Sequence, residues 1–190
     1  MRRIGTTVVA LALAGATIGA TAITASAAPG GAARAATSCP TGWGSMTKGS
    51  PDAGAVPLAD VRTGRHDCYD RIVFDVPGGG GHLGYFVRYV DRLHQDGSGN
   101  HIPVNGGAIL EIRLAAPSYD PETGGVAYPG EVAKPLPGVS VSGYRTFRDT
   151  RFAGSFEGET QIGLGVRARL PFRVLQLSDR LVVDVAHSWS

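Results

Sequence analysis

The chain has 190 residues, with 18 Lys and Arg residues against 16 Asp and Glu residues. Because two of the arginines lie in a segment that we expect to be removed, the mature protein is near neutral. That balance argues against binding to nucleic acid or to an anionic membrane, since both need an accumulated basic surface.

The N-terminus has the pattern of a cleavable secretory signal. Arg2 and Arg3 precede an uncharged stretch of apolar and small residues over 4–23, and residues 25–27 (Ala-Ser-Ala) fit the small-x-small cleavage pattern. A retained transmembrane helix is the weaker alternative, because the stretch is rich in Ala, Gly and Thr and has no basic stop-transfer flank. We therefore predict that residues 1–27 are a signal peptide. The protein is then secreted, with no stable membrane insertion after cleavage.

Residues 28–57 are dominated by Gly, Pro, Ala and Ser, so we expect an irregular N-terminal arm. Cys39 in this arm and Cys68 are the only cysteines of the sequence. In an oxidising environment such a pair favours a disulfide over the alternative, a nucleophilic or redox-active thiol. Closing a loop of about 30 residues would stabilise the fold by roughly 3 kcal/mol and tie the arm to the domain.

Residues 58–190 consist of short segments rich in Val, Ile, Phe and Tyr, separated by clusters of Gly, Pro, Asp and Asn. No segment of ten or more residues has a helical apolar stripe. These features predict an all-β domain, a compact β-sandwich of two pseudo-symmetric sheets. The expected strands are 69–76, 84–93, 108–115, 139–147, 160–167, 172–177 and 180–186.

Two of these strands are near copies of each other. Residues 70–76 and 179–185 share the pattern Asp-Arg-aliphatic-Val-apolar-Asp-Val. An internal duplication would place the copies in equivalent positions of a pseudo-symmetric sandwich, whereas chance similarity in a Val-rich β protein is the alternative. Alternate side chains would then face the core: Ile72, Phe74 and Val76 from the first copy, and Leu181, Val183 and Val185 from the second.

Residues 116–138 contain five prolines and four glycines and cannot form regular strands. We interpret this segment as a long surface loop. Loops of this length in a compact domain are usually functional or disordered, so this one is a place to look for a binding surface.

Two glycine motifs carry no nucleotide-binding signal. Residues 79–84 satisfy G-x-G-x-x-G, but the following 85–90 are β-branched and aromatic, and the dinucleotide motif needs a helix there. Gly163 and Gly165 lie inside an expected strand, where glycine indicates a close backbone approach or a bulge.

Few residues of the sequence suggest catalysis. His66 lies next to Asp67 in the densest polar cluster, and a His beside a carboxylate can act as an acid or base. Glu157 and Glu159 share a face of an extended chain but have no separate acid and base roles, and they resemble a polar turn. The other histidines lie in separate segments. We therefore expect no metal site and no cofactor.

Several segments carry a resemblance to a known family. They are 39–44 (CPTGWG), 63–71 (TGRHDCYDR), 84–91 (GYFVRYVD), 154–160 (GSFEGET) and 163–174 (GLGVRARLPFRV). Together they resemble the AMIN-like domain proteins that actinobacteria secrete, over residues 39–189. Residues 171–174 and 180–185 are also similar to the closing strands of the AMIN domain itself. The resemblance implies a sandwich of two related β-sheets that targets proteins to peptidoglycan or envelope sites, without catalytic residues.

We therefore expect a secreted module that acts by binding and is not an enzyme. The leading ligand is cell-wall glycan or peptide, and an envelope protein is the second possibility. Aromatic faces would contact sugar rings and guanidinium groups would contact carboxylates. The alternative is a cell-wall hydrolase that uses His66 with Asp67 or Glu157. The candidate ligand-binding residues are Trp43, Tyr119, Tyr128, Arg145, Arg148 and Arg151.

Overall fold

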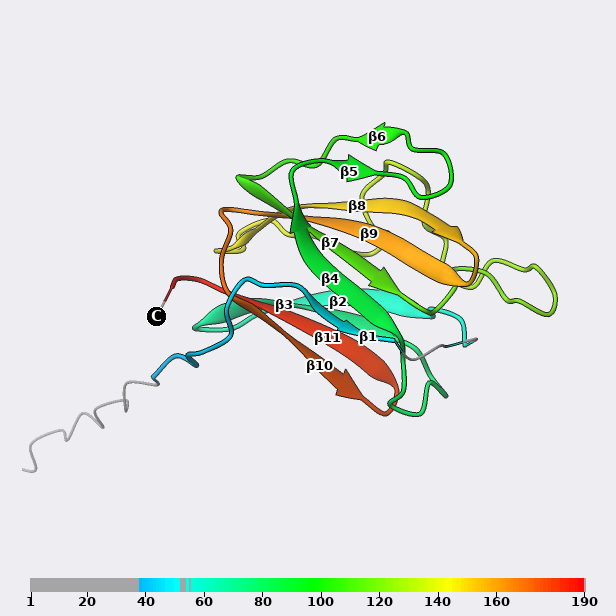
Figure 1. Cartoon of the computed structure of the whole chain (residues 1–190), viewed down its shortest axis with the longest axis horizontal. Coiled ribbons are helices and arrows are strands. Elements are labelled where there is room, and N and C mark those ends of the chain that lie inside the picture. The colour runs from blue at the N-terminus through cyan, green and yellow to red at the C-terminus, as the bar shows by residue number, and fades with distance from the viewer. Residues whose placement is uncertain (1–37, 52–53, 55, 190) are drawn as a thin grey trace, which may run out of the picture. The chain divides into compact units, whose positions relative to one another are not determined.

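The computed structural model describes residues 38–51, 54 and 56–189, so the expected signal peptide lies outside the described residues. The described part of the chain contains eleven strands and no helix. The prediction of an all-β sandwich is confirmed, because two antiparallel sheets pack face to face around one main core (Figure 1). Within these residues no helix is present that would be long and apolar enough to cross a membrane.

The larger sheet has five strands in the order β1-β4-β7-β9-β8. Its edge strand β1 is short and pairs only with the first half of β4, so the outer edge of Arg88 to Val90 is not covered by β1. The strands are β1 (Lys48–Ser50), β4 (Tyr85–Val90), β7 (Ala108–Leu114), β9 (Glu159–Val166) and β8 (Phe147–Phe156).

The smaller sheet has four strands in the order β10-β11-β3-β2. A two-stranded hairpin, β5 and β6, packs on the outside of the larger sheet, where Leu93 and Ile102 form a second small core with Ala153. The strands of the smaller sheet are β10 (Phe172–Leu177), β11 (Arg180–Ala186), β3 (Tyr69–Asp75) and β2 (Asp60–Arg65), and those of the hairpin are β5 (Leu93–His94) and β6 (His101–Ile102).

The two copied segments lie side by side in the smaller sheet, so they do not relate one sheet to the other as the expected pseudo-symmetry of the two sheets would require. They form β3 and β11, which pair antiparallel with Asp70 opposite Val185 and with Val73 opposite Val182. The first residue of one copy is therefore paired with the last residue of the other, and so on along both strands. This register defines a local twofold axis between Val73 and Val182. All six side chains predicted to face the core are buried at 2% exposure or less.

One expected strand is wrong. Residues 139–146 form turns and irregular backbone, and the strand that the sequence analysis missed is β8, from Phe147 to Phe156. Two register shifts in the pairing of β8 with β9 interrupt the alternation of apolar and polar residues, which hid this strand. The short strands β1, β2 and β6 were also not predicted; β1 lies within the segment that was expected to be irregular.

The two glycines of β9 lie where another segment of the chain comes close. A Cβ at Gly163 would collide with the side chain of Leu93, and one at Gly165 would collide with the carbonyl oxygen of Asn105. Both neighbours belong to the segment that forms or follows the β5–β6 hairpin. The predicted close backbone approach is therefore confirmed at Gly165, whereas Gly163 makes room for a side chain. Both glycines let the hairpin rest on the sheet.

Candidate binding surface

Aromatic and arginine side chains gather on the outer face of the smaller sheet. We call this group the Trp43 cluster; it consists of Trp43, Tyr69, Arg71, Arg173 and Asp184. Alternation along β3, β10 and β11 turns the last four outward, because their neighbours Ile72, Phe172, Val183 and Val185 fill the core.

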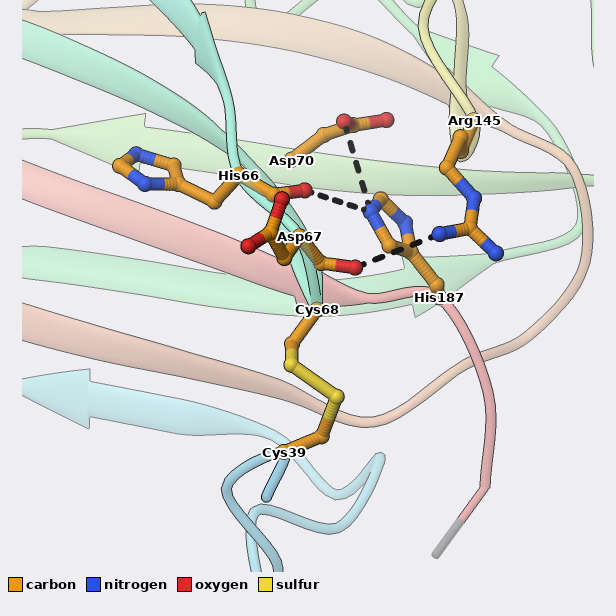
Figure 2. The surroundings of a disulfide bond; sticks show 7 residues. All are labelled: Cys39, His66, Asp67, Cys68, Asp70, Arg145 and His187. Carbon is orange, nitrogen blue, oxygen red and sulfur yellow. Dashed lines mark hydrogen bonds and ion pairs between the residues drawn. A yellow bond between two sulfur atoms is a disulfide. The ribbon is translucent and has the colours of Figure 1, made fainter. Parts of the chain in front are cut away.

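The disulfide and one backbone bond hold Trp43 against the sheet. Cys39 is bonded to Cys68, the residue directly before Tyr69, with the two Cα atoms 5.3 Å apart (Figure 2). The backbone N–H of Phe172 donates to the carbonyl oxygen of Gly44 at 2.9 Å. The predicted disulfide is therefore present, and it fixes the arm beside the first residue of β3.

The side chains of the Trp43 cluster contact one another through ring faces and guanidinium groups. The rings of Trp43 and Tyr69 are 5.5 Å apart and tilted by 59°. The guanidinium of Arg173 lies 4.5 Å from the centre of the Trp43 ring and 5.4 Å from that of Tyr69. Arg71 lies 5.3 Å from the Tyr69 ring on its own strand. Such cation–π contacts orient the guanidinium groups next to the aromatic faces.

Asp184 holds the two arginines in place from below. Its side chain is completely buried and accepts hydrogen bonds from Arg71 Nε at 2.6 Å and Arg71 Nη2 at 2.9 Å, and from Arg173 Nε at 2.8 Å. The hydrogen bond with Asp184 raises the pKa of Arg71 above its ordinary value, against the opposing effect of burial. Two cations share one anion, so the group has a net positive charge.

The local twofold axis repeats the charges of this surface but not its aromatic part. Asp75 is the equivalent of Asp184, and it is paired with Arg62 at 2.7 Å and with Arg180 at 3.7 Å. The position equivalent to Tyr69 is Ser178. The aromatic rings are thus confined to one end of the smaller sheet, which distinguishes the Trp43 cluster from its pseudo-symmetric counterpart.

The two tyrosines of the long loop lie apart from this surface. Tyr119 is half-buried, pairs with Val126 in an isolated bridge and accepts a hydrogen bond from the Gly158 N–H. Tyr128 is 3% exposed, and its ring packs near Phe152 in the core. Burial raises the pKa of Tyr128. Its ring face is occupied by the core, so we do not retain Tyr128 as a ligand-binding candidate.

The three candidate arginines are occupied by local partners. Arg145 is exposed and donates to the carbonyl oxygen of Asp67 at 3.3 Å. Arg148 donates to three carbonyl oxygens of residues 144–147. Arg151 pairs with Asp149 at 3.1 Å and donates to the carbonyl oxygen of Pro103. Of the six candidates from the sequence, only Trp43 belongs to the Trp43 cluster; Tyr69, Arg71 and Arg173 were not among the six.

His66 does not form an acid–base pair with a carboxylate among the described residues. Its ring stacks on Tyr69, with ring centres 4.4 Å apart. Glu157 lies in the turn between β8 and β9, at the opposite end of the sandwich from the turn between β2 and β3 that contains His66 (Figure 1). The geometry therefore brings His66 next to an aromatic ring, away from the glutamate that the hydrolase alternative considered.

A histidine does meet a carboxylate elsewhere, between His187 and Asp70, which the sequence analysis missed (Figure 2). Asp70 Oδ2 accepts hydrogen bonds from the N–H groups of Thr146 and Phe147, and Oδ1 lies 3.9 Å from His187 Nε2. His187 Nε2 donates to the carbonyl oxygen of His66 at 3.0 Å. Asp70, Thr146 and His187 are between 0% and 7% exposed. This buried group joins the ends of β3, β8 and β11.

The described residues contain no group of three or more His, Cys, Asp or Glu side chains that could hold a metal ion. Fold and surface together define a class of protein: a β-sandwich that presents a surface of aromatic rings and guanidinium groups. A family model for the AMIN-like domain matches residues 56–187, and the chain belongs to this family. AMIN-like domains are generally non-catalytic modules associated with the cell envelope. No curated protein and no solved structure matches the chain.

Proposed function

We propose that the protein is a secreted, non-catalytic module that binds peptidoglycan through the Trp43 cluster. The observation that carries this proposal is the close arrangement of two aromatic rings and two guanidinium groups on one outer face. Aromatic rings stack on the apolar faces of sugars, and guanidinium groups recognise carboxylates with two parallel hydrogen bonds. Peptidoglycan presents both kinds of group.

The anchoring of the Trp43 cluster supports a binding role. The disulfide next to Tyr69 and the buried Asp184 fix the side chains before a ligand arrives. Binding then loses less conformational entropy than it would on a mobile surface, which favours affinity. The AMIN-like family supports the envelope as the place where this binding occurs.

Co-sedimentation with purified cell walls tests the proposal. The Trp43→Ala variant should bind about tenfold more weakly, or worse, because a central aromatic contact at an interface accounts for a large share of affinity. Arg71→Gln should also bind more weakly. The matched control is Arg180→Gln, because the local twofold axis makes Arg180 the equivalent of Arg71. This variant should bind like the unaltered protein.

Equal retention of the unaltered protein and its three variants would contradict binding through the Trp43 cluster. Retention no greater than that of an unrelated secreted β protein would contradict peptidoglycan as the ligand. Capture of an envelope protein that depends on Trp43, without retention on walls, would assign the same surface to a protein partner. The hydrolase alternative predicts clearing of cell walls in a zymogram that His66→Ala abolishes. We expect no clearing.

A further inference from the structure

A second polar site lies on the other side of the sandwich, on the outer face of the larger sheet. Side chains of β4 and β7 form its floor, and the segment around β5 forms its wall. We call it the β5 pocket and define it by Arg88, Arg92, His94, Asp96, Glu111 and Arg113. The pocket has a volume of about 320 Å³, which is within the range of small-molecule sites in proteins.

Glu111 organises the floor of the β5 pocket. It is 4% exposed and accepts hydrogen bonds from Arg88 Nε at 2.8 Å, Gln161 Nε2 at 2.7 Å and Arg113 Nε at 3.3 Å. Burial alone would raise its pKa, but the hydrogen bonds from Arg88 and Gln161 and the charges of both arginines outweigh burial and lower it. Glu111 therefore remains ionised and holds Arg88 and Arg113 side by side.

The pocket also contains guanidinium donors that no carboxylate uses. Asp96 is paired with Arg113 at 3.1 Å. Arg92 is exposed and, within the described part of the chain, makes no hydrogen bond or ion pair. Only the Nε of Arg88 is used by Glu111, so its two Nη groups are available as donors. The pocket is lined by three arginines and two carboxylates, and a third carboxylate, that of Glu159, lies 4.0 Å from Arg113. The unused donors are those of Arg88 and Arg92.

We propose that the β5 pocket binds the anionic group of a small molecule, either a carboxylate or a phosphate. Arg92 and the free Nη groups of Arg88 donate to its oxygens, and Glu111 fixes the Arg88 side chain in position. Paired guanidinium donors match the planar or tetrahedral oxygens of such groups. This site is independent of the Trp43 cluster, because it lies on the outer face of the opposite sheet. Its success or failure therefore leaves the proposed function untouched.

Nuclear magnetic resonance titrations of the intact secreted chain test the site. Inorganic phosphate and N-acetylglycine are added separately at constant ionic strength, with N-acetylglycinamide as the neutral probe, and the arginine Nε–H signals are followed. We expect saturable shifts for Arg88 and for the amides around β5 with one or both anions, and none with the neutral probe. Binding of inorganic phosphate would identify a phosphate group as the ligand, and binding of N-acetylglycine would identify a carboxylate.

Two substitutions make the test specific to the pocket. Arg92→Gln should weaken binding of the anion about tenfold or more, since a hydrogen bond to a charged group contributes on the order of a factor of ten. The matched control is Arg65→Gln, because Arg65 is also exposed and has no ion pair within the described residues. The proposal is overturned if neither anion gives saturable shifts at the pocket, or if Arg92→Gln binds as tightly as Arg65→Gln.

Discussion

The local twofold axis provides a controlled comparison of one ion pair in two environments. Asp184 and Asp75 occupy the same position of the copied segments, and each is shared by two arginines. The side chain of Asp184 has no exposed surface, whereas that of Asp75 is 20% exposed and its arginines are 42% and 48% exposed. Substitution by Asn keeps the shape at both positions and removes the charge.

The two substitutions should differ clearly in their effect on stability. Asp184→Asn leaves two partly buried arginines without a carboxylate. Removing one partner of a buried ion pair reduces the free energy of unfolding by several kcal/mol. We expect about 3 kcal/mol, the lower end of that range, because both arginines can still reach water. At Asp75, solvent screens the pairs, and the loss should be about 0.5–1 kcal/mol. The difference of about 2 kcal/mol corresponds to about 4–8 °C in melting temperature for a domain of this size.

Thermal unfolding of the purified variants, followed by circular dichroism, measures this difference. Urea unfolding at 25 °C gives the same comparison as a free energy. Asp184→Asn should unfold at a distinctly lower temperature than Asp75→Asn. Equal losses for the two variants would mean that burial does not determine the contribution of these ion pairs, and would refute the reasoning.

Three further outcomes follow from the structure. Replacing Cys39 and Cys68 by Ser should lower the unfolding free energy by about 3 kcal/mol in a urea titration, and an unchanged midpoint would contradict it. Gly165→Ala should destabilise the domain by more than 1 kcal/mol because its Cβ would collide with the backbone of Asn105. Gly64→Ala should not, because its Cβ would make only an ordinary contact with the His66 side chain; calorimetry compares the two. Burial raises the pKa of Tyr89 to about 12 from 10.0, so the unfolded chain loses this proton first. The contribution of Tyr89 to the free energy of unfolding should therefore be complete below pH 10 and fall by up to about 2–3 kcal/mol between pH 10 and 12. The Tyr89→Phe variant should not show this contribution to the loss.

The sequence predicted the strands whose apolar residues alternate regularly. β3 and β11 are examples, since every second residue of each faces the core. β8 escaped because two register shifts, one between Phe147 and Asp149 and one between Phe152 and Gly154, break its alternation. β2 escaped because it is a charged edge strand with only Val61 buried. Periodicity reports one-sided burial, so strands that bend or lie at an edge give a weaker signal.

The candidate surface was only partly predictable. Trp43 was named as a candidate because it is an aromatic residue of the arm, but its neighbours Arg71 and Arg173 come from strands far apart in the sequence. Their proximity depends on the pairing of β3 with β11 and of β11 with β10. One signal was present in the sequence: the copied segments are preceded by Tyr69 in one case and by Ser178 in the other. That asymmetry indicates which copy lies at the aromatic end.

Hydrogen–deuterium exchange with soluble peptidoglycan fragments tests the central claim most directly, since it locates the ligand on the folded protein. The proposed function predicts slower exchange over residues 69–71 and 172–174 in the presence of the fragments. The pseudo-symmetric segment 178–181 should be unchanged. Protection confined to another face, or equal protection of both ends of the smaller sheet, would contradict the assignment of binding to the Trp43 cluster.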